Sequence, residues 1–338
     1  MSNKIRFAVV GLGHIGKRHA QMIINNTEAD LVALCDIKAK EELNIDTVKV
    51  PLFNTIDDLL NSKIDFDVVN ICTPNGVHAE QSLKALENKK HVVCEKPISL
   101  TKASAEKIIF KSLQVSKHVF SVMQNRYSPP SIWLKNIVDN KILGDIYMVH
   151  LNCFWNRDER YYHKGNWHGT KDLDGGTLFT QFSHFIDMMY WLFGDITNIK
   201  ASFKDFSHNQ LTEFEDSGVV SFDFVDGGSG SLNYSTSVFD TNFESSITII
   251  GEKGTIKVAG QYMNEVVYCN IKDYEMPKLE ATNPPNSYGE YKGSAANHQY
   301  VIQNVIDTIK GKSAITTNAL EGLKVVDIIE RIYSLKEK

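Results

Sequence analysis

The chain has 338 residues, of which 42% are hydrophobic and 23% are charged, and its formal net charge is -5. This length exceeds the usual range of a single domain, so two domains with separate cores are expected. The composition is that of an ordinary globular protein, and the slightly acidic balance excludes the basic field that nucleic acid requires. A small molecule is therefore the expected partner.

The sequence has the pattern of a soluble protein that is not exported. The N-terminus passes from Lys4 and Arg6 into a short apolar run without a signal peptide, and no run approaches the roughly 18 apolar residues of a membrane span. The five cysteines are odd in number and widely spaced, which favours buried thiols over disulfides or metal ligands. A cytoplasmic location, no membrane partner and no metal are expected.

The first 125 residues alternate between short apolar runs and stretches with helical spacing. Strands are expected at 5–10, 31–36, 67–72, 91–94 and 118–123, and helices at 14–25, 57–61, 78–88 and 103–116. Repeated alternation of this kind predicts a doubly wound parallel sheet, so residues 1–125 are expected to form a Rossmann domain.

The pattern changes after residue 125. Strands are expected at 146–155, 219–225, 230–238, 246–251, 255–258 and 266–271, several of them with alternating polar and apolar residues. Helices are expected from Pro129, at 178–193, at 298–310 and at 319–336. Residues 126–338 are thus predicted to form an α+β domain with an open, mostly antiparallel sheet, which binds substrate and mediates oligomerisation.

A glycine loop lies between the first strand and the first helix. In Gly11-x-Gly13-x-x-Gly16 the glycines permit a tight turn, close approach of a pyrophosphate and close helix packing, and the helix N-terminus at His14 and Ile15 offers free N–H groups. Asp36 ends the second strand, where its carboxylate would bind ribose hydroxyls and repel a 2'-phosphate. The loop predicts that NAD, rather than NADP, is the cofactor.

Polar residues follow two later strands at the same sheet edge. Thr73, Pro74, Asn75 and His78 come after the strand that ends at residue 72; they also suit an ordinary turn and helix start. Lys96 follows the next strand, where a lysine could stabilise a developing alkoxide, although most lysines of this kind are solvated loop charges.

The helix at 178–193 carries Gln181, His184 and Asp187 at three-residue spacing, so they share a face. A histidine on such an apolar helix is more often a core residue. Its usual pKa near 6.5 nevertheless makes His184 the best candidate for the base that removes a hydroxyl proton.

The segment 155–171 places cations among aromatic residues. It could be a solvated surface loop, or a binding loop in which the cations meet phosphate or carboxylate oxygens and Trp167 covers a flat ring. The cations are Arg157, Arg160, Lys164 and Lys171.

With these motifs in place, the chain resembles the glucose-fructose oxidoreductase/inositol dehydrogenase (Gfo/Idh/MocA) family over essentially its full length. The motifs are the glycine loop with Asp36, the Thr73–Asn75 turn, Glu95-Lys96-Pro97, and Gly175-Gly176 followed by His184-x-x-Asp187. The resemblance implies that Lys96 and His184 are the catalytic pair. It also implies that Glu95 and the 73–78 turn surround the nicotinamide end of the cofactor, and Gln124 is placed in the same cofactor set.

Many members that oxidise free sugars or inositols have an aspartate four residues before the histidine, where this chain has Thr180. Local runs, including Gln181-Phe-Ser183-His184 and Trp167-His-Gly169-Thr170, instead resemble the WlbA/WbpB subgroup. Those enzymes oxidise the sugar 3-hydroxyl of UDP-N-acetylglucosaminuronic acid with NAD, on the way to surface polysaccharides.

The resemblance therefore implies a dehydrogenase of UDP-GlcNAcA in lipopolysaccharide O-antigen biosynthesis, with Lys96, Arg157, Arg160, Trp167, Gln181 and His184 around the substrate. A dehydrogenase of a free sugar or inositol is the nearest alternative, and an NAD-binding sensor without catalysis is a more distant one. A homodimer or homotetramer packed through the open sheet is expected, and 2-oxoglutarate is considered as a second substrate that reoxidises NADH.

Overall fold

The computed structural model describes residues 4–45, 48–163, 166–289 and 291–336. The described residues form two compact units, one drawn from the ranges 4–123 and 298–326 and the other from the ranges 124–297 and 327–336. The division near residue 123 lies close to the boundary expected at 125. Residues 298–326, however, are grouped with the first unit, because α8 (His298–Ile309) packs on α1 (His14–Asn25) rather than within the second unit.

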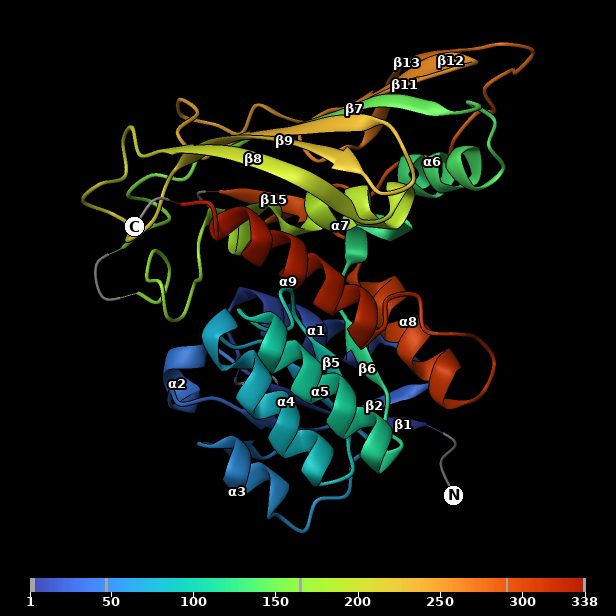
Figure 1. Cartoon of the computed structure of the whole chain (residues 1–338). Helices are drawn as coiled ribbons and strands as arrows, with labels where there is room; N and C mark the ends of the chain where they lie inside the picture. The colour runs from blue at the N-terminus through green and yellow to red at the C-terminus, as the bar shows by residue number, and fades with distance from the viewer. Residues whose placement is uncertain (1–3, 46–47, 164–165, 290, 337–338) are drawn as a thin grey trace. The chain divides into compact units, whose positions relative to one another are not determined.

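The first unit is a parallel sheet with helices (Figure 1). Its strands have the order β3-β2-β1-β4-β5-β6, and every neighbouring pair is parallel. The strands are β1 (Ile5–Val10), β2 (Ala29–Cys35), β3 (Leu52–Phe53), β4 (Val68–Ile71), β5 (His91–Cys94) and β6 (Val119–Ser121). The helices besides α1 and α8 are α2 (Lys40–Leu43), α3 (Ile56–Leu60), η1 (Asn75–Val77), α4 (His78–Glu87) and α5 (Lys102–Val115).

The central strands are apolar on both faces, as strands covered by helices must be. Residues 7–10 of β1 and all four residues of β4 are buried. Two helices begin at threonines whose hydroxyls accept a backbone N–H: Thr55 from Asp58 at 3.1 Å, and Thr101 from Ser104 at 3.2 Å. The predicted doubly wound parallel sheet is confirmed.

The second unit contains a seven-stranded sheet with the order β13-β12-β11-β7-β10-β9-β8. The strands are β7 (Ile146–Phe154), β8 (Ile196–Lys204), β9 (Ser217–Phe224), β10 (Ser229–Ser235), β11 (Glu244–Gly251), β12 (Gly254–Ala259) and β13 (Glu265–Ile271). The pairs are antiparallel except for β7 with β10, so the predicted mostly antiparallel sheet is confirmed. A small sheet pairs β14 (Pro285–Ser287) with β15 (Lys292–Ala295).

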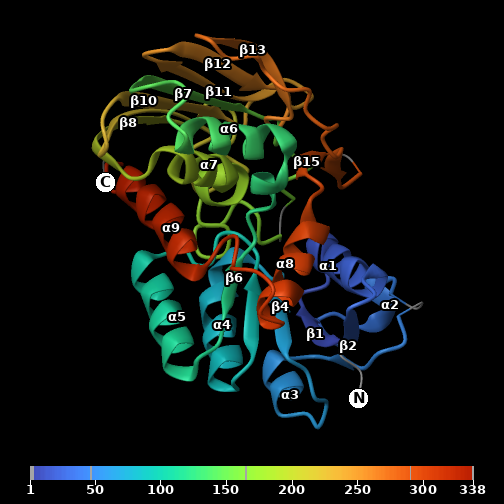
Figure 2. The same ribbon diagram turned by 90° about the vertical axis from the view of Figure 1, so that its right-hand side faces the viewer.

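The helical segments of the second unit are η2 (Gln124–Tyr127), α6 (Pro129–Asp139), the π-helical turn η3 (Leu178–Phe182) and α7 (Ser183–Phe193). The helix α9 (Ala319–Tyr333) begins in the first unit and ends in the second. Figure 2 shows α6 and α7 on one face of the seven-stranded sheet. Phe182 and Phe193 contact Tyr234 and Phe224 of that sheet, with ring centroids 5.9 and 5.3 Å apart.

Register aligns one fully buried residue from each of five neighbouring strands into a row across this sheet. The row consists of Val258, Ile247, Leu151, Leu232 and Val220. Because side chains alternate between faces along a strand, the polar residues between them point away from the core. This is the physical basis of the alternation seen in the sequence.

Four strands were not predicted from the sequence. The edge strand β8 carries Ile199, Ala201 and Phe203 on one face, but these are only half-buried and alternate with exposed polar residues that include two lysines. The strands β3, β14 and β15 are only two, three and four residues long. Among the described residues, no helix is both long and apolar enough to cross a bilayer. All five cysteines are free thiols, and Cys35, Cys94 and Cys153 are buried.

Candidate functional site

The glycines of the first loop have separate roles. Gly11 has a φ of +85°, and a Cβ there would lie 2.7 Å from the Cys72 carbonyl oxygen. A Cβ on Gly16 would lie 1.7 Å from the Gly11 oxygen, which leaves no room for one. A Cβ on Gly13, in contrast, would meet nothing within 4 Å. Protein packing therefore does not require glycine at position 13, and the open space suits a ligand that approaches the backbone closely.

The start of α1 lies beside this loop. Gly13, which precedes the helix, has no side chain to cap it, His14 is exposed and Ile15 is half-buried, and a helix N-terminus favours an anion. Asp36 follows β2, and its carboxylate accepts the backbone N–H of Leu12 at 2.5 Å and that of Lys38 at 2.9 Å. The structure thus brings the predicted ribose-binding carboxylate to the glycine loop.

The turn after β4 is held by His78. The imidazole is buried, with Nδ1 2.7 Å from the Pro97 carbonyl oxygen and Nε2 2.7 Å from that of Thr73. The Thr73 hydroxyl donates to Gln81 at 2.7 Å. Asn75 is buried and Pro74 is half-buried and extended. Both nitrogens of His78 therefore face backbone carbonyls at the ends of two neighbouring strands rather than a ligand, and because burial lowers the pKa of the imidazole, the neutral ring donates to one of the two.

Glu95 and Lys96 follow β5 at the same sheet edge, where Lys96 is half-buried and Glu95 is buried. The Glu95 carboxylate contacts His19 and the backbone N–H of Lys96, at 2.9 and 3.2 Å. This carboxylate is thus engaged inside the first unit, directly before the predicted catalytic lysine.

In the second unit, η3 leads directly into α7, and a π-helical turn of this kind often marks a functional site. Gln181 and His184 are both buried. The side-chain amide of Gln124 donates to His184 Nε2 at 3.1 Å. Gln124 was predicted to bind cofactor; in this unit its amide lies against the predicted base, which makes Nε2 the acceptor.

Asp187 is paired with a residue that sequence reasoning did not single out. Arg126 Nε and Nη2 donate to its two carboxylate oxygens at 2.8 and 2.6 Å, and both side chains are buried. A carboxylate on an apolar helix needs a buried cation as its partner. The position of Asp187 in the sequence could therefore have indicated that a buried arginine or lysine lies beside it. Asp187 fixes the helix to η2 and is not positioned as an acid or a base.

Asp174 is a second residue that sequence reasoning did not single out, and it is fully buried. The Thr180 hydroxyl donates to its carboxylate, and the other carboxylate oxygen accepts the Gly169 N–H at 2.8 Å. A carboxylate is therefore present beside position 180, although it comes from the preceding turn rather than from the helix.

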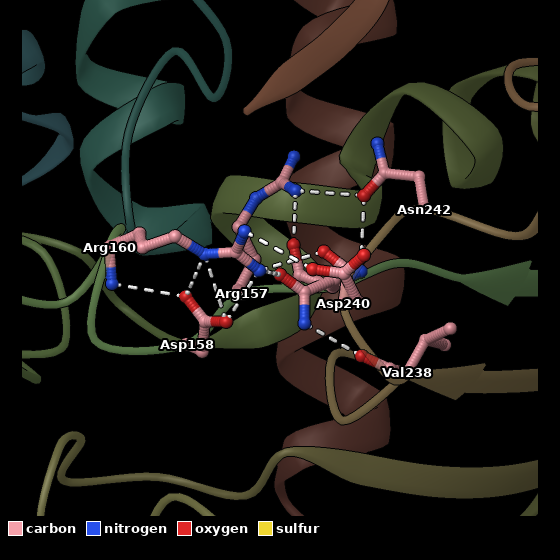
Figure 3. A network of polar contacts seen from close by, with 7 residues as sticks. Arg157, Asp158, Arg160, Val238, Asp240 and Asn242 are labelled. Carbon is pink, nitrogen blue, oxygen red and sulfur yellow. Dashed lines mark hydrogen bonds and ion pairs between the residues drawn. The ribbon is translucent and has the colours of Figure 1, made fainter. Parts of the chain in front are cut away.

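Arg157 lies in the network of Figure 3 and is only 2% exposed. Its guanidinium donates to Gln181 Oε1 at 2.7 Å, to Asn242 Oδ1 at 3.0 Å and to the carbonyl oxygens of Asn156 and Lys292 at 2.5 and 3.1 Å. Three rings surround it, those of Trp155, Tyr161 and Tyr291, with centroids 4.9 to 5.3 Å away. All four acceptors are neutral, and no described carboxylate forms an ion pair with this arginine.

Arg160 differs, because it is half-exposed and paired with Asp158 and Asp240, at 2.7 and 3.5 Å (Figure 3). Trp167 is half-buried and stacks on His168, with centroids 3.9 Å apart. Lys171 is exposed, and Lys164 lies outside the described residues.

An open cavity of about 410 Å³ adjoins this network in the second unit. Its lining includes the cations Arg157 and Arg160, His208, and the carboxylates Asp158 and Asp240 that are paired with Arg160. The cavity gives a polar ligand access to the side of the unit on which the unpaired guanidinium charge lies.

Family comparisons agree with both units. Residues 5–122 match the oxidoreductase family with an NAD-binding Rossmann fold, and residues 132–257 match the GFO/IDH/MocA C-terminal domain. The open space at Gly13 and the uncapped start of α1 fit the dinucleotide that this family binds. The predicted cofactor, NAD, is confirmed.

Two solved structures are similar over almost the whole chain. The WlbA dehydrogenase from Chromobacterium violaceum, in complex with NADH and UDP-GlcNAcA, is 31% identical with a TM-score of 0.88 and covers 98% of this chain and 94% of its own. The WlbA dehydrogenase from Bordetella pertussis, with the same ligands, is 28% identical with a TM-score of 0.87 and covers 98% and 96%.

An inositol 2-dehydrogenase from Salmonella typhimurium is 28% identical over 259 residues, which are 74% of this chain and 72% of the relative. The relatives thus include oxidoreductases of different hydroxyl compounds on one fold. The chain belongs to the GFO/IDH/MocA family and is an NAD-dependent oxidoreductase.

Proposed function

We propose that the protein oxidises the sugar 3-hydroxyl of a UDP-N-acetylhexosaminuronate such as UDP-GlcNAcA, giving a 3-keto nucleotide sugar for surface polysaccharide such as lipopolysaccharide O-antigen. The observation that carries the proposal is the buried Arg157 guanidinium, which has four neutral acceptors. A buried cation is stable when a negative charge neutralises it, and a uronate carboxylate or a diphosphate supplies that charge in bidentate form.

His184 and Lys96 have different proposed roles: His184 accepts the proton, and Lys96 stabilises the negative charge. His184 has Nε2 as the acceptor of the Gln124 amide, so this nitrogen carries the lone pair that a base needs to take the hydroxyl proton. Lys96 stabilises the negative charge that develops on the sugar oxygen. NAD, when bound, supplies the hydride acceptor.

The anion site and the base are connected within the second unit. Gln181 holds Arg157 at 2.7 Å and lies three residues before His184 on the same helical segment. A ligand carboxylate bound to Arg157 would therefore have its position fixed relative to His184, the proposed base. Arg160, which also lines the cavity, and Trp167 complete the proposed substrate set.

The likeness to two dehydrogenases crystallised with NADH and UDP-GlcNAcA supports this substrate class. The likeness to an inositol 2-dehydrogenase favours the second candidate, a dehydrogenase of a free sugar or inositol. The two candidates share the proposed catalytic pair and differ in the need for an anion site.

The experiment that separates them follows absorbance at 340 nm with NAD and four compounds: UDP-GlcNAcA, UDP-GlcNAc, myo-inositol and glucose. NADH formation with the uronate alone supports the proposal, and a stop after one turnover that 2-oxoglutarate relieves would identify 2-oxoglutarate as the second substrate. Turnover of inositol or glucose alone would select the second candidate. If none of the four compounds gives NADH although NAD binds, the non-catalytic NAD-binding sensor would be favoured.

We further propose a homodimer or homotetramer that packs through the outward face of the seven-stranded sheet. Met148, Val219 and Tyr268 share this face by register and are 42, 57 and 50% exposed. These three side chains lie among polar residues of the same face, and exposed apolar groups surrounded by polar ones mark interaction sites. Light scattering of the protein and of a Val219→Lys variant tests this, and a native monomer would contradict it.

A further inference from the structure

A cluster of buried polar side chains lies at the carboxyl end of β5 in the first unit. Glu95 is 7% exposed, and His19 of α1, Asn70 of β4 and His298 of α8 are at most 1% exposed. Glu95 Oε1 lies 2.9 Å from His19 Nε2 and 3.5 Å from His298 Nε2. Three elements that are remote in the sequence thus meet at the residue that precedes Lys96.

Asn70 determines which nitrogen of His19 carries a proton. Its amide nitrogen, which can only donate, lies 2.8 Å from His19 Nδ1, so Nδ1 is the acceptor and the ring proton is on Nε2. His19 Nε2 therefore donates to Glu95. Turning the amide around would place its oxygen at Nδ1, but Nε2 would still face a carboxylate, which only accepts.

Glu95 transmits this contact to the backbone of Lys96. Burial by itself raises the pKa of the Glu95 carboxyl, but hydrogen bonds from His19 and His298 outweigh burial and hold the pKa well below its usual value. The carboxylate is therefore ionised at neutral pH, and its Oε2 accepts the Lys96 N–H at 3.2 Å. The backbone that carries the lysine is anchored on its N-terminal side.

The buried imidazole of His78 lies on the other side of Lys96. Its Nδ1 is 2.7 Å from the carbonyl oxygen of Pro97, the next residue in the chain, and its Nε2 is 2.7 Å from that of Thr73. The segment that bears Lys96 is thus anchored before the lysine by Glu95 and packed after it against His78.

We propose that His19 and Glu95 are a positioning pair for Lys96, in which His19 holds the Glu95 carboxylate and the carboxylate holds the lysine backbone. The inference rests on the charge-stabilising role proposed above for Lys96. A charged group that moves by about 1 Å can lose roughly a hundredfold in rate, so a fixed backbone at this position contributes directly to turnover. Neither His19 nor Glu95 contacts the substrate in this proposal.

The cluster also has the composition of a zinc site, since ligand atoms of His19, Glu95 and His298 lie within 4.8 Å of one another. A zinc ligand must offer a lone pair, however, and His19 Nε2 instead carries the proton that Glu95 accepts. A hydrogen-bonded network therefore fits the cluster better than a metal does. Turnover that a chelator abolishes and zinc restores would overturn the proposal.

The test compares His19→Leu with His19→Gln, each in the native and the Lys96→Ala background. Glutamine can still donate to Glu95 from an amide nitrogen near the position of Nε2, whereas leucine cannot. In the native background we expect His19→Leu to lower kcat about ten- to a hundredfold with little change in the Kd for NAD, and His19→Gln to restore most of the loss. In the Lys96→Ala background His19→Leu should change kcat by less than about twofold, because the group that it positions is gone.

An equal loss of kcat in both backgrounds would mean that His19 does not act through Lys96, and the proposal would be wrong. Native turnover by the Lys96→Ala protein alone would instead refute the proposed role of Lys96, so the two failures are distinguishable. If His19→Leu does not fold, Glu95→Gln serves in its place, because it keeps the shape of the side chain but removes the charge and replaces one of the two acceptor oxygens by an NH2 donor, so it can no longer accept from both His19 and the Lys96 N–H. A loss of kcat of about tenfold is expected for it in the native background alone, and unchanged kcat would overturn the proposal.

Discussion

Gln124 Nε2 donates a hydrogen bond to His184 Nε2 over 3.1 Å, so an uncharged amide faces the nitrogen that is proposed to act as the base. An amide of this kind favours the neutral imidazole, because it donates to the lone pair without adding negative charge. The hydrogen bond also predicts that the substrate hydroxyl takes the place of the amide when it binds.

The Gln124→Glu variant tests this arrangement. A carboxylate would accept a hydrogen bond from His184 and favour the imidazolium, so the acid limb of the kcat/KM profile should move up by about one pH unit. The measurement is kcat/KM between pH 5.5 and 9, with Gln124→Met as the uncharged control. If the acid limb of the kcat/KM profile does not move in the Gln124→Glu variant, His184 is not the group whose protonation causes that limb.

Thr180 and Asp174 give a second prediction. The family aspartate, introduced as Thr180→Asp, would place a second carboxylate against Asp174, which is fully buried. Two like charges cannot both ionise there, so one carboxyl should stay protonated in the folded protein with a raised pKa. Its contribution to stability is present at low pH and lost as the pH rises.

The measurement for Thr180→Asp is the unfolding free energy in urea at pH 5 and at pH 8. We expect a loss of about 1 to 3 kcal/mol at pH 8 that is smaller at pH 5, and no gain of inositol oxidation. Thr180→Ser, which keeps the hydroxyl, is the matched control and should resemble the native protein. If Thr180→Asp is as stable as the native protein at pH 8, the contact between position 180 and Asp174 is contradicted.

Arg157→Met removes the buried guanidinium. It leaves Gln181 Oε1 without its donor and takes one of two donors from Asn242 Oδ1 and from the Lys292 carbonyl, so a loss of about 2 kcal/mol in unfolding free energy is expected. If the arginine binds the uronate, the ratio of kcat/KM for UDP-GlcNAcA over UDP-GlcNAc should also fall about tenfold or more. Urea denaturation and initial rates measure the two effects.

Arg160→Met is the control for this variant, because Arg160 is half-exposed and already paired with Asp158 and Asp240. Its Tm should change little. Unchanged selectivity in Arg157→Met, together with reduced stability, would assign Arg157 a structural role and remove the main support for the anion site.

His91 gives a pH dependence of stability. Burial, with the nearby cations Lys117 and His118, lowers its pKa to about 4. The unfolded chain, with the usual value near 6.5, therefore binds a proton at a higher pH than the folded protein. The stability that His91 contributes is complete above about pH 6.5 and is lost as the pH falls toward 4.

The His91→Asn variant keeps an acceptor for the His118 N–H, which His91 Nδ1 accepts at 3.0 Å, but does not titrate. Between pH 7 and pH 4.5 it should lose about 1 to 2 kcal/mol less than the native protein, a value reduced because the ring is partly exposed. Urea denaturation at a series of pH values gives both curves. Parallel curves would show that His91 does not titrate within this range.

Much of the first unit could be predicted because its signals are local. The glycine loop, the helix that follows it and Asp36 lie within one short βαβ segment, and the structure joins them through the contact of Asp36 with the Leu12 N–H. The predicted helix around His184 was also recovered, apart from the π-helical turn at 178–182, which no periodicity indicated. The edge strand β8 was missed although Ile199, Ala201 and Phe203 alternate with polar residues along it, because Thr197 and Asn198 interrupt the alternation near its start.

The amino-acid sequence by itself determined the family, the two-part organisation, the cofactor and the candidates Lys96 and His184, because each depends on residue types at short spacings. Tertiary structure alone decided the partners of those residues: Arg126 for Asp187, Asp174 beside Thr180, His19 on Glu95, and the three rings around Arg157. Whether a charged side chain is a ligand, a counter-ion or a support depends on burial and on residues far away in the chain. Those contacts exist only once the chain has folded, so no local pattern encodes them.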